Sequence, residues 1–199
     1  MRKKQATKKK AARRAPAKVR AKKPARASKR SKPMDQEAMM QMWQKSMTPG
    51  PWHAALEPMV GSFHARTTFV MSKGEQPSVS EGSSDNRWVL GGRYLEQLYR
   101  GMSMGMPFEG IGYTGYENMK KRYVGTWMDS FGTGLMNSRG TGKPTSRVME
   151  FEAMAHEPSG KVVKFLCKIT IQDHDHHTYE MWTLGPQRFR SMLVEYTRK

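Results

Sequence analysis

The sequence predicts a mainly β protein: a single antiparallel up-and-down β-barrel of the lipocalin-like kind, with short N-terminal helices and a disordered basic N-terminal tail. Three observations predict it. Hydrophobic and polar residues alternate with a period of two from residue 63 onward, glycine-rich or polar turn signals separate the alternating segments, and no helical segment is long enough to connect parallel strands. Closing such a meander into a barrel removes its exposed edges.

Residues 1–34 are predicted to be a disordered tail of Lys, Arg, Ala and Pro. Residues 1–33 hold sixteen Lys or Arg and no acid, which leaves 19 basic residues against 17 acids, a net charge of +2, for the rest of the chain. The tail lacks the apolar side chains that could offset the entropy cost of folding. It resembles the tails of linker histones and histone-like bacterial proteins. Its expected role is non-specific attachment to DNA or RNA by counterion release, through Lys3, Lys4, Lys8, Lys9, Lys10, Arg13, Arg14, Lys18, Arg20, Lys22 and Lys23.

The same composition leaves two other roles open for the tail. A polycation also binds anionic lipid, and a charged tail can serve solubility with no specific partner. The tail has no apolar stretch of the kind that a signal peptide needs. A single cysteine, Cys167, excludes an internal disulfide and suits a reducing compartment. The expected location is therefore the cytoplasm, with attachment to the nucleoid through the tail.

Residues 35–59 are predicted to form short helices. Asp35 is a candidate N-cap of a helix over 35–47, and its apolar stripe consists of Met39, Met40, Trp43 and Met47. Packing of this stripe against the barrel is the favoured expectation, and a partner-binding surface is the alternative, because Met adapts to many shapes. Thr48–Pro51 should end this helix, and a second one is expected over 52–59.

The barrel is predicted to occupy residues 60–199. Nine strands are expected, separated by turn signals such as Gly91–Gly92 and Gly140–Gly142. Twelve of the eighteen glycines lie between Gly91 and Gly142, where they allow sharp coiling or leave room inside a barrel. The nine segments are 63–71, 78–90, 93–101, 108–117, 121–130, 146–155, 161–171, 177–184 and 188–197.

Four sequence runs carry a resemblance to a known family. They are Arg87–Leu95, Met104–Asn118, Tyr123–Asp129 and Glu195–Lys199. In order and spacing they resemble a mainly bacterial domain family of unknown function, over about residues 48–199. The resemblance implies a lipocalin-like, calycin-type barrel and brings no established activity.

One position departs from the family pattern. Families of this type often begin the first strand with Gly-x-Trp, whose ring packs beneath an Arg of the last strand. Here the stretch reads Gly61-Ser62-Phe63, and Arg198 is the implied partner. A Phe keeps a weaker cation–π contact. Phe63 and Arg198 are therefore interpreted as structural residues.

The lumen is the default ligand site of a small barrel. Alternation in 121–130 predicts that Tyr123, Gly125, Trp127 and Asp129 share the inner face. Arg93 is expected either to pair with Asp129 or to hold the acid group of a ligand. The alternative is that these aromatic side chains only fill the core. The full candidate ligand site comprises Trp88, Arg93, Tyr113, Tyr116, Tyr123, Trp127, Asp129 and Trp182.

Metal and catalytic sites have weaker signals, and no cofactor is expected. Met102, Met104 and Met106 have a spacing that suits Cu(I) on a strand, but packing is favoured. The run Asp173–His177 has ligand-type side chains in His174, His176 and His177, yet a solvated turn is favoured over a metal site. The glycine pattern of 110–115 matches a dinucleotide fingerprint but has no helix after it, so it is rejected.

The leading functional hypothesis is non-enzymatic binding of a small apolar or amphipathic ligand, with the basic tail attaching the protein to nucleic acid. A filled barrel that acts as a scaffold, with binding only through the tail, is the alternative. A hydrolase-like enzyme that uses the lumen is the third. Ligand identity and oligomeric state are open at this point.

Overall fold

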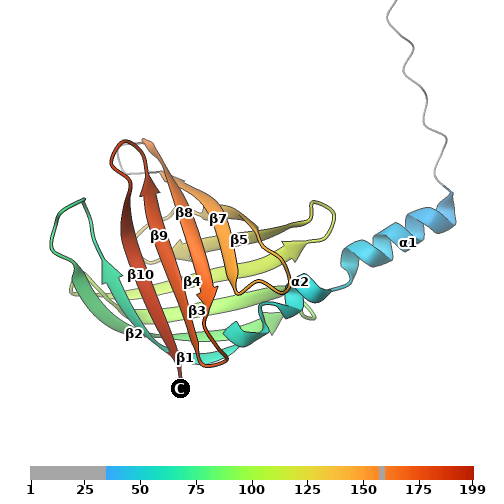
Figure 1. The fold of residues 1–199 in the computed structure, drawn as a ribbon, viewed down its shortest axis with the longest axis horizontal. Coiled ribbons are helices and arrows are strands. Elements are labelled where there is room, and N and C mark those ends of the chain that lie inside the picture. The colour runs from blue at the N-terminus through green and yellow to red at the C-terminus, as the bar shows by residue number, and fades with distance from the viewer. Residues whose placement is uncertain (1–34, 157–159) are drawn as a thin grey trace, which may run out of the picture. The chain divides into compact units, whose positions relative to one another are not determined.

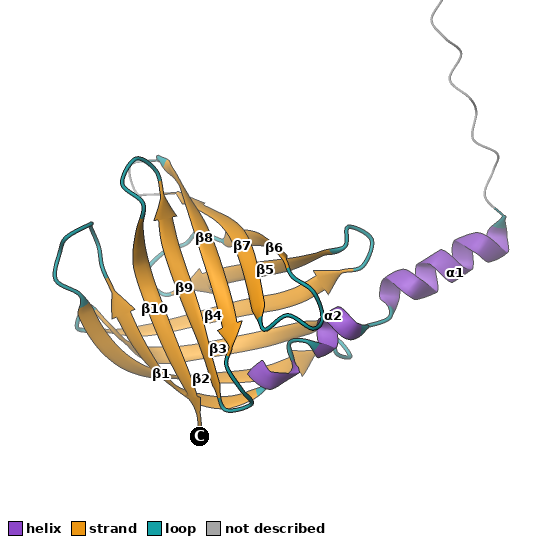
Figure 2. Cartoon of the chain, in the orientation of Figure 1, coloured by secondary structure: helices purple, strands orange, loops and turns teal. Residues whose placement is uncertain are grey.

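The computed structural model describes residues 35–156 and 160–199, and within them ten β-strands form one closed barrel (Figures 1 and 2). Each strand pairs antiparallel with its neighbours in the chain, and β1 closes the barrel against β10. The predicted mainly β, up-and-down barrel is confirmed. The predicted tail lies outside the described residues. The strands are β1 Gly61–Phe69, β2 Ser78–Val89, β3 Tyr94–Ser103, β4 Met106–Glu117, β5 Arg122–Asp129, β6 Met136–Thr141, β7 Val148–His156, β8 Val162–Ile171, β9 His176–Leu184 and β10 Phe189–Arg198.

Strand β6 is the one strand that the alternation pattern missed. Its inner positions are Met136, Ser138 and Gly140, so only one of them carries a large apolar side chain. Gly140 was expected in a turn, but it lies in the strand, where the ring of Phe151 fills the space beside it. A Cβ at Gly140 would stand 2.5 Å from that ring. The glycine therefore serves close packing inside the barrel rather than a chain reversal.

Three short helical elements precede the barrel: α1 Gln36–Met47, α2 Pro51–Ala54 and the 3-10 turn η1 Glu57–Met59. The second predicted helix is thus divided into α2 and η1. The expected packing of the α1 stripe on the barrel is wrong, because α1 has no buried residue. None of the described helices is both long and apolar enough to cross a bilayer.

The segment from α2 to η1 lies at one end of the barrel, which we call the plugged end (Figure 2). Leu56 is fully buried there, and Met59 is 7% exposed in the same core cluster as Leu95 and Tyr123. The side-chain amide of Asn86 in β2 donates to the Met59 carbonyl at 2.8 Å. The other end, where the β1–β2, β3–β4, β5–β6 and β9–β10 connections lie, is called the open end.

Candidate functional site

The inner face of β5 carries the side chains that the alternation predicted. Tyr123 is fully buried in one core cluster, and Trp127 packs on a second one. Gly112 of the neighbouring strand β4 makes room for the indole ring, since a Cβ there would lie 2.9 Å from Trp127 Cε3. The concentration of glycine in β4 therefore lets a large ring lie flat along the inside of the barrel wall.

At the plugged end, Arg198 ties the last strand to the helical segment. Its guanidinium lies 4.6 Å from the centre of the Phe63 ring, which confirms the contact expected between these residues. The same group donates to the carbonyls of Val60 at 2.7 Å, Pro58 at 2.9 Å and His174 at 2.7 Å. A cation that satisfies three carbonyls closes this end structurally.

His177 is buried beside this arrangement and is 3% exposed. Its ring stacks on Tyr196 at 4.4 Å and meets the edge of Phe63 at 4.7 Å. Neither ring nitrogen has a hydrogen-bond partner among the described residues. Burial, with a smaller contribution from the nearby Arg198 charge, lowers the pKa of His177 to about 4. The imidazole is therefore neutral at physiological pH.

Three predicted site residues pack against the plug instead of lining free space. The ring of Tyr116 stacks on Trp52 at 5.1 Å and meets Tyr123 edge-on at the same distance. The Tyr123 hydroxyl donates to the Trp52 carbonyl at 3.0 Å. Trp88 donates from its indole nitrogen to the Glu57 carboxylate at 2.7 Å. Together these contacts make the plugged end a filled core.

A row of polar side chains crosses the middle of the lumen, and the sequence reasoning missed it. Gln97 donates to the Ser84 hydroxyl at 2.9 Å and to the Tyr196 hydroxyl at 3.2 Å, and Ser84 donates to Asn86 at 2.7 Å. Burial raises the pKa of Tyr196, so it stays protonated. The sequence could have indicated this row: Ser84 and Asn86 lie four and two residues before Trp88 in the same strand, so they face inward if Trp88 does.

Toward the open end, the inward side chains become partly exposed. The Trp127 indole donates to Asp129 at 2.9 Å, and Asp129 also accepts from the Phe131 backbone at 3.0 Å. Phe108 meets the edge of Phe131 at 5.0 Å. Trp127 and Asp129 are thus brought together as predicted, with an apolar wall beside a carboxylate. The inward side chains of intermediate exposure at this end include Phe108, Trp127, Asp129, Met136, Phe165, Met181, Thr183 and Met192.

Arg93, by contrast, lies away from Asp129. It follows the β2–β3 turn, and its guanidinium donates to the Leu90 carbonyl of that turn at 2.8 Å. The start of β3, next to Arg93, pairs with Gly115 of β4, whereas Asp129 pairs with Gly110, five residues earlier in β4. The expected Arg93–Asp129 pair is therefore wrong, because the two side chains belong to opposite ends of the strands.

Tyr113 and Trp182 lie on the outer face of the barrel. Gly112 and Tyr179 point inward, and positions that differ from them by an odd number point outward. The Tyr113 hydroxyl donates to Glu96 at 2.9 Å, and Trp182 lies under the Arg188 guanidinium at 5.4 Å. The prediction that these rings line the lumen followed their aromatic character and neglected strand parity, and it is wrong.

The residues considered for metal binding and catalysis are spread over different faces. Asp173 accepts from the backbone nitrogens of Asp175 and His176, each at 2.8 Å, so this run forms the β8–β9 turn. His174 and His176 are exposed, whereas His177 points inward. No group of three or more His, Cys, Asp or Glu residues in the described part of the chain could hold a metal ion.

Neither the methionines of the β3–β4 hairpin nor the cysteine forms a metal or catalytic site within the described residues. Met102 and Met106 lie on opposite faces of the β3–β4 hairpin, and Met104 occupies its turn with a φ of 51°. A single continuous strand would place the three sulfur atoms on one face, but in this hairpin they do not share a face. Cys167 is buried as expected, and its Sγ accepts from the Tyr179 hydroxyl at 3.1 Å. Burial raises the pKa of this thiol, which keeps it in the less reactive protonated form.

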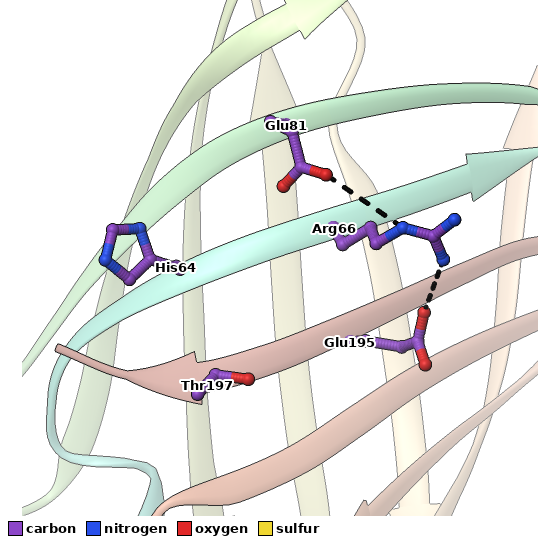
Figure 3. A pocket seen from close by; sticks show the side chains of 5 residues that line it. All are labelled: His64, Arg66, Glu81, Glu195 and Thr197. Carbon is purple, nitrogen blue, oxygen red and sulfur yellow. Dashed lines mark hydrogen bonds and ion pairs between the residues drawn. The ribbon is translucent and has the colours of Figure 1, made fainter.

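Two shallow hollows lie on the outside of the barrel. One, of about 300 Å³, is lined by His64 and by Arg66, which contacts Glu195 at 3.0 Å and Glu81 at 3.9 Å (Figure 3). All three members of this ion-pair row are about half exposed or more, so the row contributes little free energy. The second hollow, of about 370 Å³, lies between the α2–η1 segment and the β6–β7 and β8–β9 connections.

One solved structure agrees with this architecture. The crystal structure of Rv2717c from M. tuberculosis is similar with a TM-score of 0.55 and 17% identity, over 76% of this chain and 99% of that chain. A redesigned β-barrel, b11L5F_LGL, aligns with a TM-score of 0.40 and 14% identity, over 75% of this chain and 96% of the other. No curated protein sequence matches the chain. At 17% identity, the likeness to Rv2717c concerns the fold alone.

The family comparison covers the whole barrel and the α2–η1 segment. The model described as "Protein of unknown function (DUF1579)" matches residues 48–198. This range begins just after α1 and ends in β10, so it agrees with the range of the sequence resemblance. The chain therefore belongs to the DUF1579 family of proteins of unknown function.

Proposed function

We propose that this protein is a non-enzymatic binding protein that holds a small apolar or amphipathic molecule in the open half of its barrel. One observation carries the proposal. The inner face that is buried at the plugged end becomes partly exposed at the open end, where Trp127, Phe108 and Phe131 form an aromatic wall. Ten strands also enclose a wider lumen than the eight that side chains alone can fill.

The charged side chains that point into the lumen indicate which kind of polar group the ligand should carry. By strand alternation, Asp129 is the one carboxylate that points inward from the described strands, and it forms no ion pair within the described residues. Arg198, the inward cation, is engaged at the plugged end. A ligand with an apolar body and a hydrogen-bond-donating or cationic end therefore suits this site better than a carboxylic acid.

The test uses the full-length chain and an uncharged apolar dye whose fluorescence rises on transfer from water. We expect saturable binding near one dye per chain. Trp127→Ala should weaken it by about tenfold or more, as expected for loss of a central aromatic contact. Trp182→Ala is the matched control, because it removes the same side chain from the outer face. Asp129→Asn should further abolish any preference for dodecylamine over dodecanoate as the displacing ligand.

The filled barrel is the second candidate function. It is favoured by the two core clusters, which occupy the lumen from the plugged end past its middle. If the dye does not saturate, or if Trp127→Ala and Trp182→Ala reduce its binding equally, the lumen holds no ligand. The barrel would then serve as a scaffold, and binding would reside in the N-terminal part of the chain.

Attachment to DNA or RNA through the basic tail stays a proposal that rests on charge alone. The tail supplies all but two of the net positive charges of the chain. Since the basic residues concerned lie outside the described residues, their sequence is the only support. Helix α1, which follows them in the chain, is described by the structure, and its side chains help to identify the polyanion that these basic residues bind.

A further inference from the structure

Helix α1 carries an apolar face that no described residue buries. Its large apolar side chains are between 44% and 60% exposed, and none of its twelve residues is buried. At 100° per residue, Met39, Met40, Trp43 and Met47 fall on one side of the helix, and Met42 lies beside them. Lone helices of this length are marginal in water, so a face of this kind indicates a surface that covers it.

The helix is held at its C-terminal end only, as far as the described contacts go. The side-chain amide of Asn118, in the β4–β5 turn, donates to the carbonyls of Lys45 at 3.1 Å, Ser46 at 3.3 Å and Thr48 at 2.8 Å. These bonds fix the point where α1 leaves the barrel. The Met and Trp side chains take no part in them and remain free to meet a partner.

The charge of the chain around α1 identifies the partner. Sixteen Lys or Arg and no acid precede Met34, and α1 follows directly. Within α1 itself, Glu37 and Lys45 balance each other. The partner must therefore attract a dense positive charge and also accept Met and Trp side chains.

A nucleic acid meets the first requirement only. Its outer surface is phosphate and sugar, which bind Lys and Arg but gain nothing from an exposed methionine face. An anionic bilayer meets both requirements, because its headgroups attract basic segments and its interface takes up the apolar face of a helix. We propose that α1 lies in the interface of an anionic lipid membrane, and that the basic residues before it supply the electrostatic attraction.

The experiment is co-sedimentation of the full-length protein with vesicles. The protein should bind vesicles of phosphatidylcholine mixed with phosphatidylglycerol, should bind pure phosphatidylcholine far less, and should dissociate as salt is raised. Met39→Gln combined with Trp43→Gln should reduce the partition coefficient about tenfold or more. Met71→Gln combined with Met119→Gln is the matched control, since these methionines are 64% and 63% exposed in turns of the barrel. It should bind as the unaltered protein does.

Three outcomes would overturn the proposal. Equal vesicle binding by the helix variant and the unaltered protein would show that the positive charge acts alone. Binding to a DNA duplex without binding to anionic vesicles would assign the tail to nucleic acid. A dimer that the helix variant converts to a monomer, with vesicle binding unchanged, would identify a second copy of the chain as the cover for α1.

Discussion

The two ends of the barrel are built from the same ten strands, yet they treat their inward side chains differently. At the plugged end, the inward residues Phe63, Leu95 and Met149 are 2% exposed or less. At the open end, the inward apolar side chains of β1 and β7, Phe69 and Ala155, are of intermediate exposure. The difference comes from the α2–η1 segment, which supplies Leu56 and Met59 to one end only. We therefore expect stability to be concentrated at the plugged end, whereas the open end is where we propose that a ligand binds.

The sharpest way to break this comparison is to remove the cation that holds the plug. Arg198→Ala deletes the donor to the Val60, Pro58 and His174 carbonyls and uncovers the Phe63 ring. Hydrogen bonds that involve a charged donor contribute about 1.5–3 kcal/mol each, with incomplete additivity. We expect a loss of about 4 kcal/mol in the free energy of unfolding, measured by urea titration.

The control for this variant is Arg190→Ala in the same strand. Arg190 is on the outer face, 43% exposed, and contacts Glu180 at 3.3 Å. An exposed pair of this type contributes less than about 1 kcal/mol. If the two variants lost equal stability, the plug would not be the more stable end of the barrel.

The pH dependence of stability tests the plugged end through His177. Its pKa falls from 6.5 in the unfolded chain to about 4 in the folded one, because the ring is buried. The unfolded state therefore takes up a proton first, and stability is complete above about pH 6.5 and declines until about pH 4. A difference of this size corresponds to about 3 kcal/mol.

His177→Phe should flatten that decline, since Phe can keep the ring contacts with Tyr196 and Phe63. Carboxylates with lowered pKa values, such as Glu96, Glu117 and Glu180, also lose stabilisation on acidification, but they do so in both proteins. The difference between the two curves of unfolding free energy against pH isolates the histidine. Parallel curves between pH 7 and 4 would show that His177 is accessible to protons in the folded state.

At the open end, Trp127→Ala measures how much of the wall is structural. Truncation of a fully buried aromatic residue costs about 3–5 kcal/mol. Trp127 is partly exposed and packs on Gly112, so we expect about 2 kcal/mol by urea titration. A loss as large as that of a fully buried aromatic residue would place Trp127 in the sealed core and remove the main support for the proposed ligand site.

The same contrast explains which features could be predicted from the sequence. Period-two alternation located nine of the ten strands, because most inward positions need apolar side chains. It failed at β6, where Ser138 and Gly140 face inward against Phe151 and leave no apolar repeat. Alternation could not predict the hydrogen bonds of the plug, since they join Arg198 to carbonyls about 140 residues away in the chain. Only the contact of Arg198 with Phe63 was expected, and that expectation came from the family resemblance.

The candidate site was predictable where strand parity was followed. Tyr123, Trp127 and Asp129 were assigned by alternation within one strand, and all three point inward. Tyr113 and Trp182 were added because they are aromatic, and both lie outside. Residue type indicates what a side chain can bind, but in a barrel its odd or even position along the strand decides whether it faces the lumen or the outside.

The smallest expected effect tests that parity directly. Tyr113→Phe removes the hydroxyl that donates to Glu96, which also binds Arg87 at 2.6 Å on the outer face. Because Arg87 still satisfies Glu96, the unfolding free energy should change less than for Trp127→Ala. Binding of the apolar dye should change by less than about twofold, as for a surface substitution. Hydrogen bonding to Glu96 raises the pKa of Tyr113. Glu96→Gln should therefore lower the pKa of Tyr113 toward that of a free tyrosine, as measured by spectroscopic titration. A Tyr113→Phe variant that lost dye binding as Trp127→Ala does would place both rings in one site. It would refute the assignment of Tyr113 to the outer face of β4 and of Trp127 to the inner face of β5.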